Sequence, residues 1–520
     1  MESKFNLRRK IAFFSILKWF FAATLIGVVV GCFNALFLHL LSKSIKFTNF
    51  CKFYYIFLPF ALLLVNYLAN KIYPKDKGFS TNAAIASIND KKPISIISSL
   101  KAFFLPILTI AAGGSAGKES PCADVGAGVA SFISKLFSFN ANERRKLMIC
   151  GVSAGFAGVF GVPISGAMFG LEVLSVGSIF YEVMFPAFIS GITSFQITHM
   201  LGVEYVYHPL QLSALNIDSS LWHVLLAGIF FGLVSLLFIE ILRLTQILFR
   251  YNSLKFSSFW KCFIAGALII LITLLTSDIY LGLTMQRVDA ILNGDNAATF
   301  GFLFKILTTS LTFAGGGVGG LITPVFFIGA NAGYFFAHLL GLNTITFAAL
   351  GLVSILAGVA NTPLAASIMA MELFGADIAP YAAVSCIVSF LITGQRSLFD
   401  KQRFHFDKNF SDDDEDFDQT RPQLENKLRK RNFFLAMVRH LIPQENSAAN
   451  PATKKENTIS PKPKLSVPEN KKETNKFEAK KTLTETLFGH LFPQENFEEK
   501  PKQNKDNSTN EKPTKKNGKI

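Results

Sequence analysis

Two aligned stretches decide the fold: TIAAGGSAGKESPCADVGAG at residues 109–128 and TFAGGGVGGLITPVFFIGAN at residues 312–331. They align without a gap at an offset of 203 residues, and both contain the same threonine, glycines and proline at matching places. A second pair follows at an offset of 200, where residues 151–174 align with residues 351–374. Small-residue bias explains some matches, but not two matched prolines and a matched glutamate in the same order. The sequence therefore predicts an internal duplication.

A glycine-rich turn precedes a proline in each copy, Gly117 before Pro121 and Gly320 before Pro324. Proline is favoured in a first helical turn because it lacks the N–H that would be left unpaired there. A helix that starts inside a membrane also carries positive charge at its N-terminus. Two such ends aimed at one place form an anion site. The alternative is that the glycines only allow close helix packing, but the occurrence of the turns as a pair favours the anion site. The candidate anion-binding residues of the turns are Gly117, Lys118, Ser120, Gly320, Leu321, Ile322 and Thr323, with Pro121 and Pro324 as structural residues.

Glu119 lies inside the first turn, and ionisable groups at membrane depth are functional candidates by default. Its carboxylate can occupy the anion site, and an anion can displace it or a proton can neutralise it. That exchange would couple anion movement to protonation. A structural ion pair with Lys118 is the alternative. Glu172 and Glu372 match between the copies, so we expect a shared structural role, such as accepting hydrogen bonds from backbone N–H groups of nearby turns.

Composition separates a membrane part from a polar tail. Of the 520 residues, 50% are hydrophobic and only 17% are charged, against about 25% charged in soluble proteins. Apolar spans begin with residues 11–41, a run too long for a cleavable signal peptide. We predict an all-α integral membrane domain at residues 1–400, with repeat halves at about 11–200 and 221–400 and re-entrant, broken helices. Residues 401–520 are expected to form a disordered basic tail.

The basic charge and the motifs exclude several classes of protein. The net charge of +15 comes from both ends of the chain, which favours cytoplasmic termini and contact with membrane lipid over nucleic acid. The six cysteines form no CxxC pair, so no metal site is expected. GGSAGKES at residues 113–120 departs from a phosphate-binding loop, and neither HExxH nor a nucleophile–histidine pair is present. We therefore expect no enzyme activity and no cofactor.

Residues 117–121, Gly-Lys-Glu-Ser-Pro, resemble the G-[KR]-E-G-P signature of the CLC chloride channel and transporter family. Residues 320–324 and 159–174 resemble two later segments of that family. The resemblance covers roughly residues 10–400. It implies an inverted pair of multi-helix halves and a homodimer in which each subunit has its own path for a halide anion. It also implies that Glu119 is the gating, proton-carrying glutamate of a transporter in a bacterial inner membrane.

Departures from the family pattern favour its fluoride/proton antiporter branch. Phe79, or Ser80 after a shift of one, stands where the family has an anion-coordinating serine. The late tyrosine of the family has no clear counterpart, and the nearest segment is residues 393–399, which ends at Phe399. Val173 takes the place of an inner glutamate. Thr323 matches the threonine of the fluoride branch. Fluoride needs close donors to replace its water, and aromatic ring edges such as those of Phe79 and Phe399 can contribute. A chloride transporter and a passive, voltage-gated-type chloride channel of the same fold are the alternatives.

Overall fold

The structure is a computed structural model that describes residues 2–48, 50, 53–72, 81–96, 99, 103–210, 217–250, 258–405 and 419–420. The chain divides into Met1–Ile442 and Pro443–Ile520, and all described residues belong to the first unit. The candidates Phe79 and Ser80 lie outside the described residues, and so do residues 421–520, with the HLIPQEN and HLFPQEN segments at 440–446 and 490–496.

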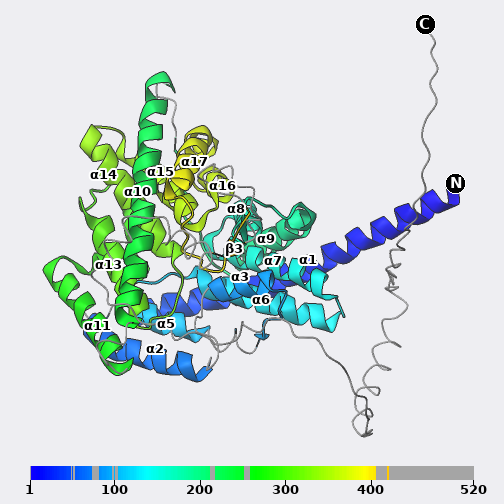
Figure 1. Cartoon of the computed structure of the whole chain (residues 1–520), viewed down its shortest axis with the longest axis horizontal. Helices are drawn as coiled ribbons and strands as arrows, with labels where there is room; N and C mark the ends of the chain where they lie inside the picture. The colour runs from blue at the N-terminus through cyan, green and yellow to red at the C-terminus, as the bar shows by residue number, and fades with distance from the viewer. Residues whose placement is uncertain are drawn as a thin grey trace, which may run out of the picture. The chain divides into compact units, whose positions relative to one another are not determined.

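The first half of the chain is helical, as the sequence predicts (Figure 1). Its elements are α1 (Glu2–Thr48), η1 (Tyr54–Phe57), α2 (Leu58–Ile72), α3 (Thr81–Asn89), α5 (Phe104–Ala111), α6 (Glu119–Leu136), α7 (Ala141–Phe160), α8 (Pro163–Glu172) and α9 (Tyr181–Met200).

The second half repeats this order. Its elements are α10 (Ile217–Arg250), α11 (Ser258–Leu275), η3 (Asp278–Tyr280), α12 (Met285–Leu292), α13 (Gly301–Ala314), α14 (Ile322–Leu340), α15 (Thr344–Ala360), α16 (Pro363–Phe374), η4 (Ala376–Ile378) and α17 (Ala379–Thr393).

Helix packing repeats between the halves. In the first half α1 packs on α9, α6 on α7 and α7 on α9; in the second half α10 packs on α17, α14 on α15 and α15 on α17. Close approaches repeat too: Gly27 of α1 faces the backbone of α9, and Gly228 of α10 faces α17, each with no space for a Cβ atom. Small residues are what allow membrane helices to approach so closely. The predicted duplication is therefore visible in the packing.

Only some helices are long enough to cross a bilayer alone. Among the described residues, five helical segments meet the length and hydropathy expected of a span: Phe13–Phe47, Leu221–Phe249, Ser258–Leu275, Ile322–Leu340 and Ala376–Thr393. Helix α5, with 8 residues, is too short to cross a bilayer alone. Helix α7, whose first turns contain Arg144, Arg145 and Lys146, is not among these five segments.

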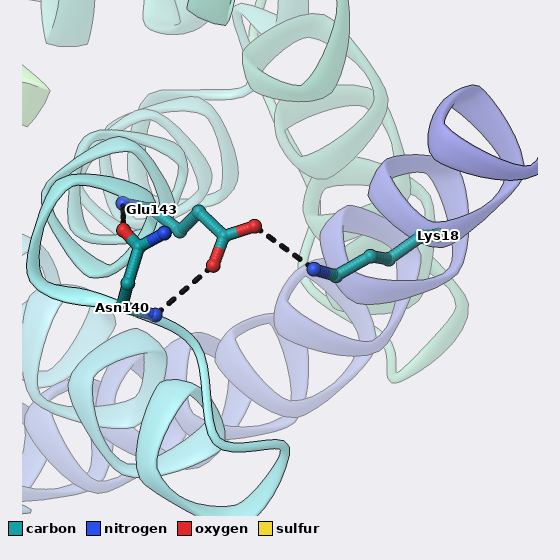
Figure 2. A network of polar contacts seen from close by, with 3 residues as sticks. All are labelled: Lys18, Asn140 and Glu143. Carbon is teal, nitrogen blue, oxygen red and sulfur yellow. Dashed lines mark hydrogen bonds and ion pairs between the residues drawn. The ribbon is translucent and has the colours of Figure 1, made fainter. Parts of the chain in front are cut away.

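A capping network holds the start of α7 against α1 (Figure 2). The side chain of Asn140 accepts a hydrogen bond from the N–H of Glu143 at 2.9 Å, and the Glu143 carboxylate accepts one from the N–H of Asn140 at 3.0 Å. This reciprocal arrangement is a capping box. The same carboxylate pairs with Lys18 of α1 at 2.9 Å. Lys18, which interrupts the first apolar run, thus has a local partner.

A small sheet ties the segment after the last helix to the first half. Strand β1 (Ser175–Val176) follows α8 and pairs in parallel with β2 (Arg403–Phe404). Strand β2 pairs antiparallel with β3 (Gln419–Thr420), which gives the order β1-β2-β3. The segment that leaves the helical domain is therefore attached to the end of α8.

Candidate functional site

The two glycine-rich turns meet. Gly117 and Gly320 form an antiparallel β-bridge in which each N–H donates to the other carbonyl, at 2.7 and 2.9 Å. The starts of α6 and α14 are thereby brought together, as the alignment predicts. However, both glycine N–H groups are used in this pairing. The backbone groups of these two glycines therefore join the two halves, and an anion would need other donors.

Two threonines that match in the alignment each form a hydrogen bond with the turn of the opposite half. The hydroxyl of Thr109 accepts a hydrogen bond from the N–H of Val318 at 3.2 Å, and the hydroxyl of Thr312 accepts one from the N–H of Ser115 at 3.0 Å. Each bond joins one half to the other. Thr109 and Thr312 were recognised only as an aligned pair, although their match across the repeat was the signal for this role.

The carboxylate of Glu119 occupies the N-terminus of α14. It accepts hydrogen bonds from the N–H of Ile322 at 2.6 Å, from the hydroxyl of Thr323 at 2.8 Å and from the N–H of Thr323 at 3.4 Å. The residue is 1% exposed. These N–H groups belong to the first turn of α14, where helix geometry leaves them without a partner and the helix dipole favours negative charge. A carboxylate therefore fills a site built for an anion.

Lys118 contacts the site through its backbone. Its N–H donates to the Thr323 hydroxyl at 3.3 Å. This hydroxyl of the second half therefore accepts from Lys118 and donates to Glu119, both in the first half. The ammonium of Lys118 lies 5.5 Å from the centre of the Phe160 ring. Between Lys118 and Glu119, both of which the structure describes, no ion pair forms. The carboxylate bonds to the opposite half instead, which removes the alternative of a structural pair.

The remaining predicted residues have contacts of their own. The hydroxyl of Ser120 accepts a hydrogen bond from the N–H of Thr81 at 2.8 Å, so Ser120 faces the start of α3. Leu321 is the N-cap residue of α14 and makes no side-chain capping bond. Phe399 is buried, and its N–H donates to the Ser397 hydroxyl at 3.0 Å. Pro121 and Pro324 fall in the first turns of α6 and α14.

Glu172 and Glu372 each bind the opposite half. The Glu172 carboxylate accepts hydrogen bonds from the N–H groups of Leu364 and Ala365 at 3.1 and 2.8 Å. The Glu372 carboxylate accepts from Ile164 and Ser165, both at 2.8 Å. The pair thus caps the starts of α16 and α8 reciprocally. The expected contacts with backbone N–H groups are present. The alignment alone could not show that each carboxylate bonds to the opposite half.

The fold and the site define a class. Two repeated halves whose helices break at a shared point inside the protein are the architecture of membrane transport proteins. The family model described as voltage gated chloride channel matches residues 61–394, more than half of the chain, so the chain belongs to this family, the CLC family. The resemblance of the Gly-Lys-Glu-Ser-Pro motif to that family is thereby confirmed. Within the described residues, no group of three or more His, Cys, Asp and Glu is arranged to hold a metal ion.

Individual relatives agree with this assignment. A protein of Pseudomonas syringae pv. tomato described as a chloride/fluoride channel protein is 33% identical over 413 residues, which cover 76% of this chain and 88% of the relative. A crystal structure described as a CLC-type fluoride/proton antiporter has a TM-score of 0.71 and 26% identity, with 75% of this chain and 99% of that chain covered. A slow cyanobacterial Cl⁻/H⁺ antiporter shares the fold, with a TM-score of 0.64, 18% identity, and 72% and 94% coverage.

Proposed function

We propose that the chain is a CLC-type anion transporter that exports a halide, with fluoride favoured, in exchange for protons. One observation carries the proposal: the Glu119 carboxylate occupies the donors of Ile322 and Thr323 at the start of α14. A site that already holds one anionic group at 2.6–2.8 Å is suited to another small anion. Glu119 then acts as the gating, proton-carrying residue.

The mechanism follows from the charge of this carboxylate. Hydrogen bonds to an ionised group are worth about 1.5–3 kcal/mol each, and those to a neutral group less. A proton on Glu119 therefore weakens its hold on Ile322 and Thr323 and releases these donors to a halide. When the halide leaves, the ionised carboxylate can return. Because one group carries the proton and blocks the anion, the two movements are linked in opposite directions.

Two features favour fluoride over chloride. The donors at the start of α14 are backbone N–H groups and one hydroxyl, which approach Glu119 as closely as 2.6 Å, and a small, strongly hydrated anion needs such close donors to replace water. The relatives described as a fluoride/proton antiporter and a chloride/fluoride channel protein also support a fluoride substrate. The name of the family favours chloride as the second candidate, and uncoupled passage through the same path is the channel alternative.

The setting of the transporter belongs to the same proposal. Residues 1–400 form the transport domain and residues 401–520 a basic cytoplasmic tail. The protein is a homodimer in the lipid of a bacterial inner membrane, with both termini in the cytoplasm, since the basic residues flank the apolar part on that side.

Liposomes loaded with fluoride or chloride test the function, with external pH and anion efflux recorded together. A fluoride gradient is expected to drive protons uphill in the unmodified protein, with chloride efflux slower. In Glu119→Gln the side chain keeps its size but carries no charge and no exchangeable acid proton, so proton movement should stop. Equal fluoride and chloride rates would remove the fluoride assignment, and preserved proton coupling in Glu119→Gln would remove the proposed gate.

A further inference from the structure

Gln402 is a polar side chain buried in the segment that leaves the helical domain, residues 396–405, here called the exit segment. It is fully buried. Its amide nitrogen donates to the carbonyls of Val173 and Ala360, both at 3.0 Å. Its amide oxygen accepts from Asn361 at 2.9 Å and from Ser397 at 2.8 Å. An amide offers two donors and two acceptor sites, so every hydrogen-bonding position of this side chain is used.

These bonds connect the two halves of the duplication. Val173 follows α8 in the first half, whereas Ala360 and Asn361 end α15 in the second half. Because Gln402 is buried, any movement that separates it from these partners would leave a polar group unpaired, which is energetically costly. One side chain therefore fixes the end of α8 relative to the end of α15.

The backbone of the exit segment reinforces the connection. The N–H of Arg403 donates to the carbonyl of Leu174 at 3.2 Å, and the N–H of His405 donates to that of Val176 at 3.0 Å. The N–H of Leu398 donates to the carbonyl of Val359 at 2.9 Å. The exit segment is thus bonded on one side to the end of α8 and on the other side to the end of α15.

A cavity of about 500 Å³ lies beside this connection. One wall comes from Glu172, residues 175–179 and Tyr181 of the first half, and the other from Asn361, Pro363 and Leu364 of the second half, with Phe390 of α17. Two side chains connect the halves here: Glu172, which lines the cavity, bonds to the start of α16. Gln402 bonds to Val173, the neighbour of Glu172 in the chain, and to Asn361, which lines the cavity. The width of the cavity therefore depends on both bridges.

We infer that Gln402 is a positioning residue for transport: it sets the separation of the two halves at this cavity and so governs the entry of water and transported ions there. The inference rests on the proposed function, since it assigns the cavity to the transport path. The exit segment contains β2, which also pairs with β3.

Gln402→Glu tests the inference with little change in shape. A carboxylate oxygen replaces the donor that faces the carbonyls of Val173 and Ala360, so two attractive contacts become repulsive. Lys401→Gln is the matched control, because the neighbouring side chain is exposed and only its carbonyl is used, by Asn89. Ser397→Ala is a milder variant: it removes one donor to Gln402 and the acceptor of the Phe399 N–H, and it leaves the native amide in place to pair with both carbonyls.

Access to the cavity is measured by the labelling of Ser178→Cys with a small methanethiosulfonate, after replacement of Cys32 and Cys51 by alanine. Ser178 lines the cavity. We expect Gln402→Glu to raise the labelling rate by about fivefold or more, Ser397→Ala to raise it less, and Lys401→Gln to leave it unchanged. The number of protons moved per fluoride should fall in the same order.

A purely structural role would lower the yield of folded protein and leave labelling and coupling per folded molecule unchanged. Parental labelling and coupling in either folded variant, Gln402→Glu or Ser397→Ala, would overturn the inference. Labelling needs no transport, so it tests the bridge separately. If the unmodified protein moved no protons with fluoride, the proposed function would fail whatever the labelling rates were.

Discussion

Removal of the Thr323 hydroxyl tests whether the Glu119 carboxylate and the anion share one donor set. This hydroxyl donates to Glu119 at 2.8 Å and accepts from the N–H of Lys118 at 3.3 Å. Thr323→Val keeps the branched shape and removes only the polar atom. The competing carboxylate must first be taken away, so we consider Thr323→Val in the background of Glu119→Gln, where fluoride alone can use the charge-assisted donors.

The size of the effect follows from the contact that is lost. A hydrogen bond to a charged group contributes about 1.5–3 kcal/mol, and about 1.4 kcal/mol changes an equilibrium constant tenfold. Thr323→Val should therefore weaken fluoride binding by about 10- to 140-fold when Glu119→Gln is present. With Glu119 intact, the substitution weakens the binding of both the carboxylate and the competing fluoride, so the apparent affinity for fluoride should change much less.

Isothermal titration of the purified protein with fluoride measures both effects. Thr273→Val is the matched control: it is the same substitution at a buried threonine, whose hydroxyl donates to the carbonyl of Ile269 within α11 at 2.9 Å. It should leave fluoride binding unchanged. If Thr323→Val binds fluoride within about twofold of its Glu119→Gln parent, the hydroxyl does not coordinate the anion, and the shared donor set is refuted.

Three further substitutions test the turn and the cap. A Cβ atom in Gly320→Ala would overlap the carboxylate of Glu119 and displace it from the start of α14, so the number of protons moved per fluoride in liposomes should fall; an unchanged number would show that this position of the carboxylate is not part of the gate. Asn140→Ala removes a helix cap and should destabilise the protein by about 1 kcal/mol. Glu143→Gln should cost less, because glutamine keeps the capping box and loses only the partly exposed ion pair with Lys18. Thermal unfolding midpoints in the reverse order would contradict this account.

The meeting of the two turns could be predicted from sequence, because matched glycines and prolines in a duplicated chain imply equivalent breaks. The partners of the polar groups could not. Nothing in the sequence shows that the N–H groups of Gly117 and Gly320 bond to each other's carbonyls, since a backbone donor has no side-chain signal. Gln402 escaped notice for a related reason: a lone glutamine after the last apolar span is indistinguishable from a solvated residue until the fold buries it.

The duplication is nearly symmetric in its backbone, yet the site is asymmetric, and the alignment explains how. At the offset of 203, Glu119 corresponds to Ile322, and Ser120 corresponds to Thr323. One copy thus supplies the carboxylate and the other supplies the N–H and hydroxyl groups that bind it. A carboxylate at both positions would place two like charges at one site, which is unfavourable. An isoleucine leaves its N–H free to donate while adding no competing charge. Symmetry therefore builds the junction of the two helices, and the difference between Glu119 and Ile322 gives one end the carboxylate and the other end the N–H group that binds it.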